Sequence, residues 1–304
     1  MVLPLSTSSV SGRSGYDPSE PCEPTVSVDS KQAERAYLER AGTDRWERVK
    51  PFSSAGHDDV VEGGRLIHDF AVALLCLEPK PGDLVLDLGA GSCWVSEWLR
   101  RFNVETVSVD IAIDMLRVGQ SRLGAGARLV AGDLEALPLA GASVDKAVCL
   151  NAFHHVPDGP LALREIHRVL KPGGRVFFSE PGSGHAARET SVSAVDGYGV
   201  QERDVIVSAL VTDCVRAGFA AVKIKPLAHT VPWFEIDAER WSRWERYAAE
   251  RRPLRAGKRA LRAVAEGLGI GKKTTAFEDT IGMELVRIVK GAIEHHPIVI
   301  AEKA

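Results

Sequence analysis

A strand-like run that leads into a glycine-rich turn is the first feature of the chain with chemical meaning. Leu84–Leu88 is apolar, Gly89, Ala90 and Gly91 follow, and a helical pattern begins a few residues later. Glycine permits backbone angles and close contacts that a side chain would block. A strand, turn and helix of this kind present backbone amides at a helix N-terminus to a ligand. Because many such turns contain glycine for geometry alone, the turn does not identify the ligand.

Two acids beside the turn narrow the chemistry. Asp87 precedes Gly89 by two residues, and Asp110 ends the next predicted strand, 19 residues after Gly91. A carboxylate at the second position can accept both ribose hydroxyls of a nucleoside. Asp87 would place negative charge beside a pyrophosphate, and Trp94 stands where a dinucleotide loop needs its third glycine, so NAD is disfavoured. The charge suits S-adenosylmethionine (SAM), which carries a cationic amino group and a sulfonium.

Alternating strand and helix patterns position these residues. Strands are predicted over 84–88, 106–109, 128–130, 144–150, 175–179, 220–225 and 297–301. Helices are predicted within 31–49 and over 60–77, 95–102, 112–123, 160–170 and 204–217. This alternation predicts an α/β protein with a parallel sheet that is covered by helices on both faces. Such sheets bind ligands at the carboxyl ends of their strands.

Five segments in this order resemble class I SAM-dependent methyltransferases of the methyltransferase type 11 kind. They are VLDLGAGSCW (residues 85–94), SVD (108–110), AGDLEALPL (131–139), VDKAVCLNAFHHVPD (144–158) and REIHRVLKPGGRVFFSEPG (164–182). The resemblance covers about residues 60–225, with the last strand as an extension. It departs from the family at Cys93, where a third glycine is frequent.

The resemblance implies a fold and a set of cofactor contacts. The expected fold is Rossmann-like, with a seven-stranded, mostly parallel sheet whose last strand is antiparallel and inserts beside residues 175–179. SAM contacts are implied for Asp87, Gly89, Ala90, Gly91, Asp110, Ile111, Met115, Asp133, Leu134 and Asn151. The implied domains are a disordered tail (1–30), an N-terminal helical cap (31–82), the SAM-binding core (83–226), a helical insertion (227–292) and the last core strand (293–304).

Two histidines after the fourth strand are the candidates for a catalytic base. Methyl transfer needs a base only if the acceptor carries a proton, and His154 and His155 titrate near neutral pH. In the methyltransferase family that this chain resembles, the HHV segment (residues 154–156) also serves as a structural or cofactor-contact element. The histidines can therefore be either catalytic bases or structural residues. Other candidates for acceptor contacts are His185 and Tyr198.

The segment before the last strand is basic. Residues 240–273 contain 11 Lys or Arg and 3 Asp or Glu, and part of the segment has the pattern of an amphipathic basic helix. It fits an anionic acceptor, an RNA backbone, an acidic membrane surface or simply a solvated helix face. We expect it to cover the acceptor site with Trp233 and Trp241, and we expect an acceptor that carries negative charge.

Composition is consistent with a soluble enzyme. The 304 residues have a net charge of −3, no long apolar run and five scattered cysteines without a CxxC pair. We therefore expect a cytoplasmic protein without a metal site. The leading hypothesis is a SAM-dependent methyltransferase with a small-molecule acceptor and no DNA partner. The alternatives are an RNA methyltransferase, a SAM-binding protein without catalysis and, least favoured, an NAD-dependent reductase.

Overall fold

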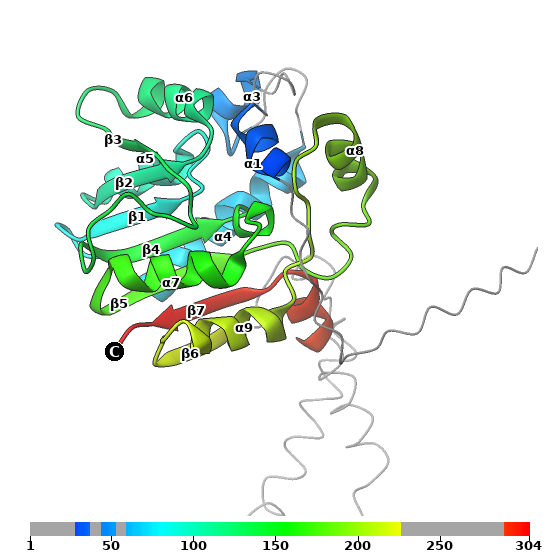
Figure 1. The fold of residues 1–304 in the computed structure, drawn as a ribbon. Coiled ribbons are helices and arrows are strands. Elements are labelled where there is room, and N and C mark those ends of the chain that lie inside the picture. Colours follow the sequence, from blue (N-terminus) through cyan, green and yellow to red (C-terminus); the bar gives the residue numbers. More distant parts are fainter. Residues whose placement is uncertain (1–27, 37–43, 53–58, 226–288) are drawn as a thin grey trace, which may run out of the picture.

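The computed structural model describes residues 28–36, 44–52, 59–225 and 289–304, which form a sheet of seven strands between layers of helices (Figure 1). The strand order is β3-β2-β1-β4-β5-β7-β6. The strands are β1 (Leu84–Leu88), β2 (Glu105–Asp110), β3 (Arg128–Ala131), β4 (Val144–Leu150), β5 (Leu170–Ser179), β6 (Ala221–Lys225) and β7 (Ile298–Glu302). The order reverses between β1 and β4, so the expected Rossmann-like fold is confirmed.

The central strands are apolar because helices cover both of their faces. On one face lie α4 (Val60–Leu77) and α5 (Trp94–Arg100), which pack Phe70 and Trp94 against the sheet. The helix α6 (Ile113–Leu123) continues this layer beside α5. On the other face lie α7 (Gly159–Val169) and α9 (Val207–Arg216), in front of the sheet in Figure 1. Cys149 in β4 is fully buried and belongs to the core on this face.

The last strand lies where the sequence analysis expected it. β7 is inserted between β5 and β6 and runs antiparallel to both, with Phe177 opposite Ile300. The residues before it, 289–295, are helical. Most of the expected helical insertion, including Trp233 and Trp241, falls outside the described residues, so its position over the acceptor site stays a prediction.

Four smaller elements surround the carboxyl ends of the strands. The first three residues of helix α1 (Val28–Arg35) fall within the expected N-terminal tail (1–30), and α3 (Asp44–Val49) follows this helix. The helix α8 (Glu189–Tyr198) lies in the crossover after β5, for which no helix was expected. The 3-10 helix η1 (Phe153–His155) contains the two predicted base candidates.

A buried polar cluster joins α4 to the sheet. The Ser179 hydroxyl donates to Asp69 Oδ2 at 2.8 Å, and His296 Nε2 lies 2.7 Å from Ser179 Oγ and 3.2 Å from the same Asp69 oxygen. All three side chains are buried. The cluster therefore connects the N-terminal cap, β5 and the chain that enters β7.

No helix in the described ranges is long and apolar enough to span a membrane.

Candidate active site

The glycine turn after β1 has the backbone geometry that its sequence predicts. Gly89 and Gly91 adopt positive φ angles of 61° and 50°. A Cβ atom on Gly89 would collide with the Cβ of Ala152, so the turn approaches the chain that follows β4 too closely for any side chain. Cys93, which replaces the third glycine, also has a positive φ of 59°. The chain thus keeps a left-handed conformation there at a cost of roughly 1–2 kcal/mol.

Asp110 links this turn to the end of β2. Its Oδ2 accepts the Gly91 N–H at 2.7 Å, and its Oδ1 accepts the Ala112 N–H at 2.8 Å. Burial raises the pKa of Asp110 to about 6, and the negative charges of Glu34 and Glu47 add to the rise, whereas the two backbone hydrogen bonds oppose it. The carboxylate faces the cavity described below, with an acceptor position left on each oxygen.

Asp87 does not reach that cavity. Its Oδ2 accepts the backbone N–H of Ser96 at 3.1 Å and the Ser96 hydroxyl at 2.7 Å, so it holds the first turn of α5. Burial raises the pKa of Asp87 to about 7, although these hydrogen bonds oppose the rise. Asp87 thus supports the turn from behind rather than lining the space for a ligand, in contrast to the contact that the resemblance implied.

A cavity of about 290 Å³ lies at the carboxyl ends of β1, β2 and β4. It brings together every implied cofactor residue except Asp87. These residues are Gly89, Ala90, Gly91, Asp110, Ile111, Met115, Asp133, Leu134 and Asn151. Its volume is at the lower end of the range for small-molecule sites. The sheet therefore offers one ligand site where strand order reverses, as the fold predicts.

Helix α1 contributes two charged side chains that sequence reasoning did not select. Lys31 Nζ lies 2.7 Å from Asp133 Oδ2 and 2.5 Å from Glu135 Oε2. Glu34 Oε1 lies 3.3 Å from His155 Nδ1 and accepts the backbone N–H of Gln201 at 3.2 Å. Both side chains line the cavity, so α1 forms part of its wall. Their sequence neighbourhood has no motif, and only the tertiary structure brings them here.

The two predicted base candidates differ in position and charge. His154 is buried and does not line the cavity, and burial together with the neighbouring His155 holds its pKa well below the usual value. His155 lines the cavity. Burial lowers its pKa, but the hydrogen bond and charge of Glu34 outweigh this and raise it to about 9. His155 is therefore a cation at neutral pH, and it can act as a base only if Glu34 moves away.

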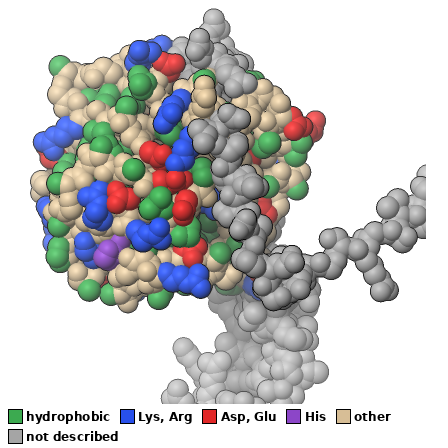
Figure 2. All heavy atoms as spheres, in the orientation of Figure 1, with side chains coloured by type: hydrophobic (Ala, Val, Ile, Leu, Met, Phe, Trp, Pro, Cys, Tyr) green, Lys and Arg blue, Asp and Glu red, His purple; other side chains and the backbone are tan. Residues whose placement is uncertain are grey.

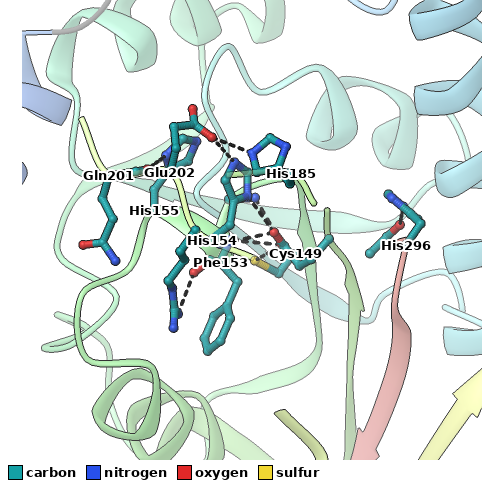
Figure 3. Close-up of polar contacts among 12 residues, drawn as sticks. Cys149, Phe153, His154, His155, His185, Gln201, Glu202 and His296 are labelled. Carbon is teal, nitrogen blue, oxygen red and sulfur yellow. Dashed lines mark hydrogen bonds and ion pairs between the residues drawn. The ribbon is translucent and has the colours of Figure 1, made fainter. Parts of the chain in front are cut away.

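A buried glutamate after β5 fixes His154 and the backbone that leads to it. Glu180 Oε1 accepts the backbone N–H groups of Ala152 and Phe153 at 3.1 and 3.0 Å. Its Oε2 lies 2.9 Å from His154 Nδ1 (Figure 3). The position of Glu180 directly after a predicted strand, at the ligand-binding edge of the sheet, was the sequence signal that could have identified it.

Two further residues predicted to contact an acceptor, His185 and Tyr198, do not line the cavity. His185 Nε2 lies 2.5 Å from Glu202 Oε2, and Glu202 itself lines the cavity. Tyr198 ends α8 and is not among the lining residues. Glu202 precedes α9 in a loop and was not selected from the sequence.

Comparison with known proteins agrees with this architecture. Residues 86–178 match the family model described as a methyltransferase domain. The chain is 40% identical over 161 residues to a malonyl-[acyl-carrier protein] O-methyltransferase of Methylococcus capsulatus, which is 51% of this chain and 58% of that protein. It is 38% identical over 104 residues to a demethylmenaquinone methyltransferase of Corynebacterium kroppenstedtii, which is 34% of this chain and 44% of that protein. The chain thus spans about half the length of these curated relatives.

A solved structure shows the same fold over most of the chain. The crystal structure of the [4+2]-cyclase SpnF aligns with a TM-score of 0.54 at 18% identity, covering 90% of this chain and 96% of that one. The fold, the glycine turn and the matched segment agree with the sequence resemblance to class I SAM-dependent methyltransferases. Residues 86–178 are the part of the chain that matches the methyltransferase-domain model, in line with the sequence resemblance.

Proposed function

We propose that this chain transfers a methyl group from SAM to a small-molecule acceptor. The observation that carries the proposal is the shared cavity, which gathers nine of the ten implied cofactor residues at the switch point of the sheet. Asp110 would accept the ribose hydroxyls, and Asp133 would accept the adenine amino group. The turn at Gly89 and Gly91 leaves room for close backbone approach.

The charges of the cavity support a cationic cofactor. Six carboxylate residues line it, against two lysines and His155. The lining acids are Glu34, Glu47, Glu62, Asp110, Asp133 and Glu202. SAM supplies an already activated methyl group on a sulfonium, so the protein has mainly to position the acceptor and exclude water. Positioning of this kind can contribute ~7–11 kcal/mol to the barrier reduction.

The nature of the acceptor is the finer part of the proposal. By their names, the relatives described above act on malonyl-[acyl-carrier protein], in which a protein carries the acyl group, and on demethylmenaquinone. We infer a small-molecule acceptor for this chain. An acceptor with negative charge would have to be recognised through residues 227–292, because the described wall is rich in carboxylates. On the face in view in Figure 2, basic and acidic side chains of the described residues are interspersed, which gives RNA binding no support there.

The test has two stages. Calorimetry with SAM, S-adenosylhomocysteine and NAD⁺ should show binding of the first two only. SAM with a labelled methyl group is then incubated with the protein and with separate small-molecule and RNA fractions. Label in the small-molecule fraction supports the proposal, and label in RNA would favour the RNA methyltransferase. SAM binding without transfer to either would favour a SAM-binding protein with another role, a relevant outcome because one protein of this fold is named a cyclase.

A further inference from the structure

Three histidines and a glutamate gather at one end of the cavity. His154 and His155 come from η1, His185 follows β5, and Glu202 precedes α9 (Figure 3). One nitrogen of His154, one of His155 and one oxygen of Glu202 all lie within 4.8 Å of one another. Two imidazoles and one carboxylate are a ligand set that transition metals use in proteins.

His154 is held in the way that metal-binding histidines are held. Its Nδ1 lies 2.9 Å from the Glu180 carboxylate, and this contact directs the other ring nitrogen away from Glu180. That nitrogen, Nε2, lies 3.6 Å from Glu202 Oε2. A ligating histidine almost always gives its second N–H to a carboxylate or a backbone carbonyl, which fixes the ring and its tautomer. Glu180 performs this role from a fully buried position.

His155 is held by a backbone carbonyl. Its Nδ1 lies 2.6 Å from the carbonyl oxygen of Gln201, the residue before Glu202. The ring packs against that of His154, with 3.9 Å between ring centroids and an angle of 40° between the ring planes. Both rings therefore use Nδ1 for a fixed partner, which leaves Nε2 as the nitrogen that can bind an ion. Glu34 also contacts Nδ1 of His155 and favours its protonated form, so an ion at Nε2 would have to displace a proton from this ring.

His185 positions the carboxylate of the set. Its Nε2 lies 2.5 Å from Glu202 Oε2, while its Nδ1 is buried and has no hydrogen-bond partner within the described part of the chain.

We propose that His154, His155 and Glu202 bind a divalent first-row transition-metal ion of the Zn²⁺ or Fe²⁺ type. The two imidazole nitrogens exclude Mg²⁺ and Ca²⁺ as preferred ions, since these take oxygen ligands. Three protein ligands leave at least one coordination position open. His155 and Glu202 line the cavity, so that position faces the space in which an acceptor would lie. A role of the ion in holding an acceptor oxygen rests on the proposed function, whereas the binding of the ion itself does not.

Metal titration of the full chain, purified without a polyhistidine tag and stripped with a chelator, tests the site. Co²⁺ should bind at one equivalent, give visible ligand-field bands, and be displaced by Zn²⁺. Glu202→Gln and His154→Gln should each weaken Co²⁺ binding at least tenfold. His167→Gln, which changes a histidine on α7 outside the cluster, is the matched control and should bind Co²⁺ as the wild type does.

Several results would overturn the proposal. They are the absence of Co²⁺ binding, unchanged affinity in Glu202→Gln, and thiolate charge-transfer bands, which would place the ion on a cysteine. If His154→Gln does not fold, Glu202→Gln decides alone, because its side chain lies at the cavity wall. SAM affinity is measured separately on the metal-free protein. SAM binding without metal binding removes only the metal site, and metal binding without SAM binding removes only the proposed function.

Discussion

The charge of Asp110 should control SAM binding, and Asp110→Asn tests this directly. The carboxylate connects the Gly91 and Ala112 amides to the cavity, and burial raises its pKa to about 6. Protonation removes one of its acceptor positions. With a pKa of about 6, ~90% of the ligand-free protein carries this proton at pH 5 and only ~3% at pH 7.5. If the ionised form binds, SAM affinity should therefore rise about tenfold between these two pH values.

Asp110→Asn should abolish that rise, because an amide does not titrate in this range. Its affinity at pH 7.5 should also fall at least tenfold, since hydrogen bonds to a charged acceptor contribute about 1.5–3 kcal/mol each. Calorimetry at several pH values between 5 and 7.5 measures both effects. Asp114→Asn, which changes a partly exposed acid in the first turn of α6, is the matched control and should keep the wild-type profile. If the SAM affinity of Asp110→Asn rises with pH as much as that of the wild type, the pH dependence comes from Asp87 instead, and the ribose contact is refuted.

Stability without ligand should change with pH in the opposite direction. A carboxyl group whose pKa is higher in the folded state binds its proton more strongly there than in the unfolded chain. The stabilisation that this tighter proton binding gives the folded state is fully present below the ordinary aspartate pKa of about 3.9. It is lost as the pH rises through about 6, the pKa of Asp110 in the folded state. The difference in free energy of unfolding between wild type and Asp110→Asn should therefore favour the wild type more at pH 4.5 than at pH 7.5.

Three further predictions concern the cavity wall, the glycine turn and the buried cluster around Asp69. Lys31→Met frees an Asp133 oxygen, so calorimetry should show SAM affinity rising about three- to tenfold; a decrease would make Lys31 a ligand contact. Gly89→Ala should lower Tm more than Gly91→Ala, because only its Cβ meets another side chain, and equal losses would leave backbone strain as the sole cause. Asp69→Ala should lower the free energy of unfolding in urea by about 3 kcal/mol by leaving buried partners unpaired, and a neutral effect would contradict that role.

The sheet could be predicted from the sequence because its strands are short apolar runs with clear breaks between them. The position of β7 followed from the family resemblance, since Pro297–Ala301 was the remaining strand pattern after β6. The turn residues Gly89 and Gly91 were predictable from the local strand–turn–helix pattern, in which both adopt positive φ angles, whereas the close contact of Gly89 with Ala152 depends on the tertiary structure. Asp87 shows the limit of such reasoning. The sequence placed it correctly beside the glycine turn, but its carboxylate accepts hydrogen bonds from Ser96 in α5 and does not line the cavity.

The charged wall of the cavity could not be predicted in this way. Lys31 and Asp133 are 102 residues apart, and Glu202 meets His154 from a loop with no pattern of its own. Such contacts depend on how the N-terminal helix and the crossover after β5 fold over the sheet. The pKa of His155 illustrates the consequence, since the residue type predicts titration near neutral pH but Glu34 raises the value to about 9.

Helix α1 connects the two ends of the site. Lys31 and Glu34 are three residues apart and therefore lie on the same face of the helix. Lys31 contacts Asp133 at the expected adenine end, and Glu34 contacts His155 at the end where the histidines gather. A ligand that binds the Asp133 carboxylate in place of Lys31 would remove one of the contacts that hold this turn of α1 in position. The charge on His155 would then depend on whether the cofactor end is filled, because the same turn carries the carboxylate that keeps the imidazole protonated.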